Sequence, residues 1–148
     1  RADLQTNSNN QITFGDVFAV QPFGNSIVTL SLTGQQIREL LEQQWSGANA
    51  DRPRILQPSK ELSYDYKKDA TAVPRATQIM ISGQALMDSK SYRVTVNSFI
   101  ADGGDNFTVL TKGTNRVGGG QDIDALEKYI NQNSPVQAPE TNRIKVIQ

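Results

Sequence analysis

Two of the five phenylalanines stand in short motifs rich in turn-forming residues. Phe23 lies between Pro22 and Gly24, and Phe99 precedes the run Gly103-Gly104-Asp105. A ring displayed in a turn can stack on a flat base, at about 1–3 kcal/mol per base, and a nearby carboxylate accepts hydrogen bonds from sugar hydroxyls. These residue types could therefore recognise a purine nucleoside. The residue types alone favour the other interpretation, in which both rings are ordinary core and the glycines form hairpins.

The composition indicates one globular domain that lacks the commonest catalytic side chains. The chain has 148 residues, enough for a single core, and its 15 Lys+Arg balance its 15 Asp+Glu. A nucleic-acid groove or an anionic-membrane surface needs a basic excess, so we expect neither partner. The chain has no cysteine and no histidine, which excludes disulfides and removes the commonest metal ligand and general base. No apolar run reaches transmembrane length, so we expect no membrane insertion by this segment.

Capping signals and hydrophobic spacing predict alternating helices and strands. Thr13 followed by Asp16 marks a helix start, and Thr33-x-x-Gln36 is a capping box. The predicted helices span 14–20, 34 to the stop at Gly47, and the segment after an N-cap at Asp122, with Ile123, Leu126, Tyr129 and Ile130 on one face. The predicted strands are 27–32, 62–66, 77–81, 92–96, 107–110 and 144–147.

The remaining segments are predicted to be irregular. They are the polar stretch 1–12, the proline-containing stretch 48–59, and 114–121, where Gly118-Gly119-Gly120 indicates a flexible loop. The run Arg52-Pro53-Arg54 is interpreted as solvated surface, and Trp45 as core. Two main helices with several strands predict a single α+β domain over 1–148.

The two aromatic motifs occur together with others that extend along the chain. They are Arg1-Ala2-Asp3, Ile12 to Val17, Val20 to Asn25, Leu32-Thr33-Gly34, Tyr92-Arg93-Val94 and Phe99 to Asp105. As a set they resemble the C-terminal domain of the 5′-nucleotidase family, which includes bacterial periplasmic UDP-sugar hydrolase/5′-nucleotidases and animal ecto-5′-nucleotidase. The resemblance covers essentially all residues, and the Pro-Phe-Gly-Asn and Phe-x-Ala-x-Gly-Gly-Asp motifs are specific as a pair.

The resemblance implies a fold and a partner domain. It implies α/β/β/α layers and places hydrolysis in a separate N-terminal metallophosphoesterase domain, absent from this chain, where two divalent metal ions activate water. This chain would then contribute substrate recognition and no catalytic or metal-binding residue, and we expect it to be inactive alone. The family also implies rotation of this domain relative to its partner and an extracellular, periplasmic or cell-surface location.

The resemblance also implies roles for five residues. Arg1 would contact the substrate phosphate, since a guanidinium binds two phosphate oxygens at once. Phe23 and Phe99 would clamp the base from its two faces. Asn25 would help to bind the nucleoside, and Asp105 would bind the ribose, while Gly103 and Gly104 would let the backbone approach the ligand closely.

Two alternatives stay open at this stage. The chain could be a non-catalytic nucleoside-binding or surface module that kept the fold, or it could belong to the related cyclic-nucleotide phosphodiesterase or sulfur-oxidation branches. A stacking site tolerates any base, so the sequence does not choose among nucleoside monophosphates, UDP-sugars, NAD and cyclic nucleotides.

Overall fold

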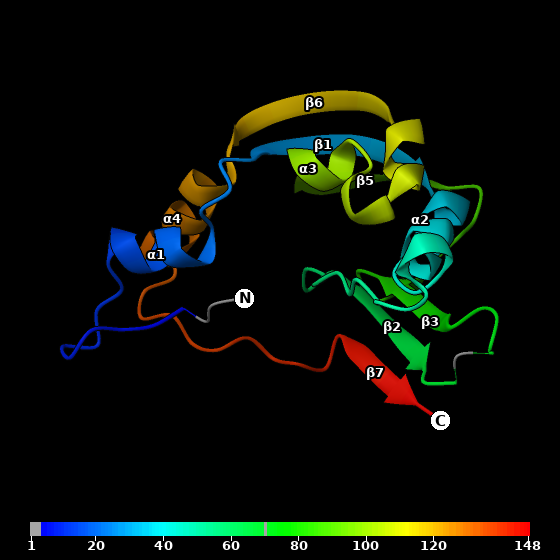
Figure 1. Ribbon diagram of the computed structural model, residues 1–148, viewed down its shortest axis with the longest axis horizontal. Helices are drawn as coiled ribbons and strands as arrows, with labels where there is room; N and C mark the ends of the chain where they lie inside the picture. Colours follow the sequence, from blue (N-terminus) through cyan, green and yellow to red (C-terminus); the bar gives the residue numbers. More distant parts are fainter. Residues whose placement is uncertain (1–3, 70) are drawn as a thin grey trace.

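Figure 1 shows the computed structural model of the chain, which describes residues 4–69 and 71–148. These residues form two β-sheets with helices between the sheets and beyond one end. Sheet A has the antiparallel order β5-β1-β6. Sheet B has the order β4-β3-β2-β7, and its last pair, β2 and β7, is parallel. The predicted α+β class is confirmed.

The elements follow each other in the order that hydrophobic spacing indicates for most of the chain. The strands are β1 (Ser26–Thr33), β2 (Leu62–Lys67), β3 (Ala76–Ile81), β4 (Gln84–Ala85), β5 (Ser91–Asn97), β6 (Thr114–Gln121) and β7 (Ile144–Ile147). The helices are α1 (Phe14–Val20), α2 (Gly34–Glu42), α3 (Ser98–Ala101) and α4 (Asp122–Gln132), with 3-10 turns η1 (Gly47–Asn49), η2 (Gly104–Asn106) and η3 (Thr108–Lys112).

The predicted N-cap at Thr13 and the predicted capping box at Thr33 are both present, and the structure shows a capping box at Thr13 as well. The Thr13 hydroxyl accepts the Asp16 amide at 3.3 Å, and the Asp16 carboxylate accepts the Thr13 amide at 2.7 Å. At the start of α2, the Thr33 and Gln36 side chains make the same reciprocal bonds at 3.2 and 2.8 Å. Reciprocal bonds of this kind satisfy amides that the first helical turn leaves without partners.

Strand β1 is the centre of sheet A and carries its side of the core. Val28, Leu30 and Leu32 are buried, as period-two alternation predicts. In Figure 1, β6 and β1 arch over α3, with α1 and α4 together beyond one end of the arch. No helix in the described part of the chain is both long enough and apolar enough to cross a bilayer.

Helix α2 joins the two sheets. It contacts β1 of sheet A and β3 of sheet B, so it lies between the sheets rather than on an outer face of the implied α/β/β/α layers. Its last residue, Glu42, accepts the Ala76 amide of β3 at 2.8 Å and the Trp45 indole N–H at 3.1 Å. Trp45 is buried, as predicted.

Two sequence predictions are wrong, and two helix boundaries differ. Residues 108–110 belong to η3, with Phe107 as its N-cap, instead of forming a strand, and the Leu110 amide donates to the Phe107 carbonyl at 3.1 Å in the i to i+3 pattern of a 3-10 turn. Residues 114–121 form β6 instead of a flexible loop, since pairing with β1 orders the glycine run. Helix α2 ends at Glu42, before Gly47, and Gln121 rather than Asp122 caps α4.

Candidate functional site

The two aromatic motifs meet at one end of sheet A. Because β1 and β5 are antiparallel, the loop that enters β1 and the segment that leaves β5 lie at the same end. Ile27 is opposite Asn97, and the Ser26 amide donates to the Ser98 hydroxyl at 3.1 Å. The fold therefore brings together two motifs that are far apart in the sequence.

Phe99 is held in place by the turn that follows it. The Asn97 side chain caps α3 by accepting the Ile100 amide at 3.0 Å. A Cβ at Gly104 would lie 2.7 Å from Cε2 and Cζ of Phe99, so the ring packs directly against this glycine. Gly104 thus makes room for the Phe99 ring, and the side chain remains 51% exposed. A ring fixed on one side and open on the other is suited to stacking.

Asp105 stands in a turn with an unusual backbone. Asp105 and Asn106 have φ of 51° and 65°, and Gly103 before them has φ of 88°. The Asn49 side chain, 2% exposed, donates to the Asp105 carbonyl at 2.8 Å. Asn106 in turn donates to the Asn49 side-chain oxygen at 3.2 Å. The buried amide of Asn49 therefore fixes the turn and leaves the Asp105 carboxylate open to solvent.

Arg54 is a candidate residue that the sequence analysis missed. It was interpreted as solvated surface, yet its Nε lies 3.9 Å from Oδ1 of Asp105. The fully buried Gln44 holds this loop, because its carbonyl accepts the Arg54 amide at 2.7 Å and its side chain accepts the Leu56 amide at 2.8 Å. No spacing in the sequence links residue 54 to residue 105, so only the fold shows the pair.

Phe23 and Asn25 lie on a loop that α4 positions. The Asp122 amide donates to the Asn25 carbonyl at 2.9 Å, and the Gln21 side chain donates to the Asp122 carboxylate at 2.7 Å. Phe23 is 71% exposed, and no ring contact joins it to Phe99 among the described residues. The structure therefore links Phe99 to the Asp105 turn through Gly104 and leaves Phe23 and Asn25 on a neighbouring loop. Arg1 lies outside the described residues.

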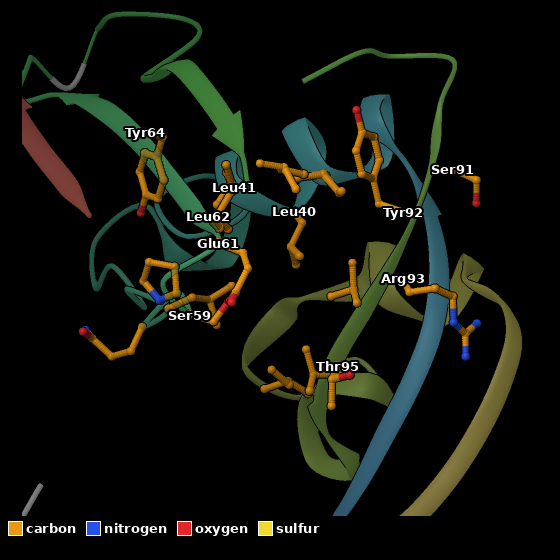
Figure 2. A pocket seen from close by; sticks show the side chains of 18 residues that line it. Leu40, Leu41, Ser59, Glu61, Leu62, Tyr64, Ser91, Tyr92, Arg93 and Thr95 are labelled. Carbon is orange, nitrogen blue, oxygen red and sulfur yellow. The ribbon is translucent and has the colours of Figure 1, made fainter. Parts of the chain in front are cut away.

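A separate apolar cavity lies between the two sheets (Figure 2). Its volume is about 560 Å³, and α2, β2 and β5 contribute most of its wall. Figure 2 shows Leu40, Tyr64 and Tyr92 around the cavity, while the Arg93 side chain points away from it. Of the predicted site residues that the structure describes, namely Phe23, Asn25, Phe99 and Asp105, none lines it. The cavity is therefore distinct from the site formed around Phe99 and Asp105.

The chemistry available at the sheet end is recognition of a polar, planar ligand. Phe99 offers a ring, and Asp105 with Arg54 offers one acceptor and one donor of opposite charge. In the described part of the chain, no three His, Cys, Asp or Glu side chains gather as a metal site would require.

Comparison with known proteins decides the family. A family model described as the 5′-nucleotidase C-terminal domain matches residues 1–112. The chain belongs to this family. The 5′-nucleotidase C-terminal domain thus includes every residue of the candidate site, from Phe23 to Asp105.

Solved and curated relatives agree with this assignment. A 5′-nucleotidase precursor from Thermus thermophilus superposes with a TM-score of 0.82 at 35% identity, over 93% of this chain and 28% of that one. A 5′-nucleotidase of Vibrio cholerae is 29% identical over 84% of this chain and 22% of its own length. A cell wall protein of Listeria monocytogenes is 34% identical over 76% of this chain and 14% of its own length. The chain therefore spans less than a third of these relatives.

Proposed function

We propose that this 5′-nucleotidase C-terminal domain binds the nucleoside part of a nucleotide at the end of sheet A. The base stacks on the open side of Phe99, Phe23 supplies the second ring, and Asp105 accepts hydrogen bonds from the ribose hydroxyls. Asn25 adds a polar contact from the Phe23 loop. The observation that carries the proposal is the half-exposed Phe99 ring, which packs against Gly104, the residue that precedes the solvent-accessible Asp105 in the chain.

Hydrolysis belongs to another part of the intact enzyme. The described residues do not fit a metal site, and the chain has no histidine to act as a general base. We infer that an N-terminal metallophosphoesterase domain of the same polypeptide supplies two divalent metal ions and the attacking water. This domain then holds the nucleoside so that the phosphate reaches those metals, with Arg1 as a phosphate contact, and rotates relative to its partner.

The intact protein acts outside the cytoplasm in this proposal. The support is the family itself and the Listeria relative, whose name places it in the cell wall. Nucleoside monophosphates are the proposed substrates, because two of the relatives reported above, from Thermus thermophilus and Vibrio cholerae, are 5′-nucleotidases.

A binding titration tests the proposal directly. Adenosine added to the isotope-labelled chain should shift the NMR signals of Phe23, Phe99 and Asp105. Phe99→Ala removes a stacked ring and should weaken binding about 5- to 150-fold, the equivalent of about 1–3 kcal/mol. Phe23→Ala should weaken it in the same direction. Addition of divalent metal should produce no phosphate release from AMP.

The matched control is Phe14→Ala, which removes another exposed ring from outside the site. Its affinity for adenosine should equal that of the wild type. If saturating adenosine leaves all three signals unchanged, the nucleoside proposal is wrong. If Phe99→Ala weakens binding and Phe23→Ala does not, Phe23 is not the second ring.

A further inference from the structure

The proposed ribose-binding carboxylate is paired with a cation. Arg54 Nε is 3.9 Å from Asp105 Oδ1, and their side chains are 53% and 40% exposed. The other ion pairs among the described residues involve different partners, namely Arg38–Asp88, Lys112–Glu39 and Arg116–Asp102. Arg54 is thus the cation that faces Asp105.

The backbone positions of Arg54 and Asp105 are fixed by hydrogen bonds to buried side chains. Gln44 is fully buried and fixes the backbone on both sides of Arg54 through its carbonyl and its side-chain oxygen. Asn49, also buried, fixes the Asp105 carbonyl from the opposite element. Because buried amides hold both backbones, the guanidinium and the carboxylate are kept within reach of each other, although both side chains are solvated.

Without a neighbouring cation, the Asp105 carboxylate would repel the phosphate of a bound nucleotide. A phosphate monoester carries nearly two negative charges at neutral pH, and its phosphate is close to the sugar that Asp105 is proposed to bind. Two negative charges that lie a few ångströms apart at a hydrated surface repel each other, because they are closer than the Debye length. A nucleoside carries no phosphate and does not feel this repulsion.

We propose that Arg54 is a specificity-determining residue that cancels the charge of Asp105, so that the site accepts nucleotides as well as nucleosides. The inference rests on the proposed nucleoside site. Asp105 supplies the hydrogen-bond acceptors for the sugar, and Arg54 keeps the net charge of the pair at zero. Arg54 acts here through Asp105 and does not bind the phosphate itself.

The test compares dissociation constants of AMP and adenosine for the 148-residue chain. Arg54→Gln leaves Asp105 unbalanced and should raise the ratio of the AMP constant to the adenosine constant by about 3- to 10-fold at low salt. Near 1 M salt, where the Debye length falls to about 3 Å, the difference should vanish. Arg54→Lys keeps the charge and should keep the wild-type ratio.

A double substitution separates charge balance from direct phosphate binding. Asp105→Asn should lower the ratio, because the cation is then unopposed. Arg54→Gln combined with Asp105→Asn makes the pair neutral again and should restore the wild-type ratio. If Arg54 held the phosphate, the double variant would keep the raised ratio, and that result would overturn the proposal.

The control variant is Arg38→Gln, which removes the same charge from a pair outside the site. It should leave the ratio unchanged. If the wild type binds adenosine but Arg54→Gln leaves the ratio of the AMP constant to the adenosine constant unchanged, the proposed role of Arg54 is wrong. The proposed nucleoside site is not affected by that result. If wild type binds neither adenosine nor AMP, the nucleoside site is wrong and this inference falls with it.

Discussion

At the scale of single residues, position 104 requires glycine because a side chain there would collide with Phe99, and not because of its backbone conformation. A Cβ at this position would lie 2.5 Å from the Phe99 carbonyl oxygen and 2.7 Å from its ring. Gly104→Ala should therefore destabilise the chain by about 1–3 kcal/mol, as overpacking does, and displace the ring. Urea unfolding measures the first effect, and adenosine titration measures the second.

Gly118→Ala is the matched control for this substitution. No heavy atom within 4 Å would meet its Cβ, and alanine restricts the unfolded chain, so the variant should gain about 0.5–1 kcal/mol. Equal unfolding midpoints for the Gly104 variant and wild type would contradict the contact that seats Phe99.

Part of the site could be predicted from sequence at this scale. Phe99 and Asp105 belong to one continuous motif, so their proximity follows from local turn chemistry. Arg54 could not be predicted, because its place beside Asp105 depends on two buried amides, Gln44 and Asn49, that tie separate elements together. Whether Phe23 and Phe99 hold one base stays a prediction.

At the scale of elements, the start of α1 should respond to pH. Asp16 accepts hydrogen bonds from the Thr13 hydroxyl and, with smaller effect, from the Thr13 amide, and both lower the pKa of Asp16 below its ordinary value of 3.8. A carboxyl group with a lowered pKa stabilises the fold above 3.8, and the contribution is lost as the pH falls through the lower folded-state pKa. Hydrogen-exchange protection of α1 should therefore fall below pH 3.8.

Asp16→Asn tests the cause of this loss. The variant lacks the titrating group, so its α1 protection should be lower at neutral pH and should change little on acidification. Amides of β1 serve as an internal reference for global unfolding. If the hydrogen-exchange protection of α1 in the wild type changes in parallel with that of β1 at every pH, the loss comes from global unfolding and not from protonation of Asp16 in the capping box.

Element prediction succeeded where the signal is local. The two capping boxes need only residues three positions apart, and both helices begin where the sequence indicates. Strand β6 could not be recognised, because its glycine run carries no apolar alternation and its order comes from pairing with β1. The apolar run 107–110 fits a buried strand and a buried 3-10 turn equally well by composition.

At the scale of the whole molecule, Glu42 ties helix α2, which also contacts β1 of sheet A, to the start of β3 in sheet B. Its carboxylate accepts the amides of Arg75 and Ala76 at the start of β3, at 3.2 and 2.8 Å, and the Trp45 indole N–H at 3.1 Å. Glu42→Gln places an N–H₂ group before these donors and should lower the free energy of unfolding by about 1–3 kcal/mol. Chemical denaturation with tryptophan fluorescence measures the change.

Glu39→Gln provides the comparison on the same helix. Glu39 forms an exposed ion pair with Lys112 at 3.1 Å, and such pairs contribute about 0–1 kcal/mol. The two substitutions remove the same charge, so the difference between them reports the hydrogen bonds of Glu42 to the start of β3 and to Trp45. Similar losses of unfolding free energy in both variants would mean that the hydrogen bonds of Glu42 do not stabilise the packing of α2 against β3.

The order of strands has a practical consequence for the choice of a C-terminal boundary when this domain is expressed. The match to the family description stops at residue 112, yet β6 completes one sheet and β7 completes the other. A polypeptide that ends at residue 112 would lack β6, the neighbour of β1, and β7, the neighbour of β2. Strands β1 and β2 would then each present bare amides and carbonyls to other molecules, which is how sheet edges recruit partners and precipitate.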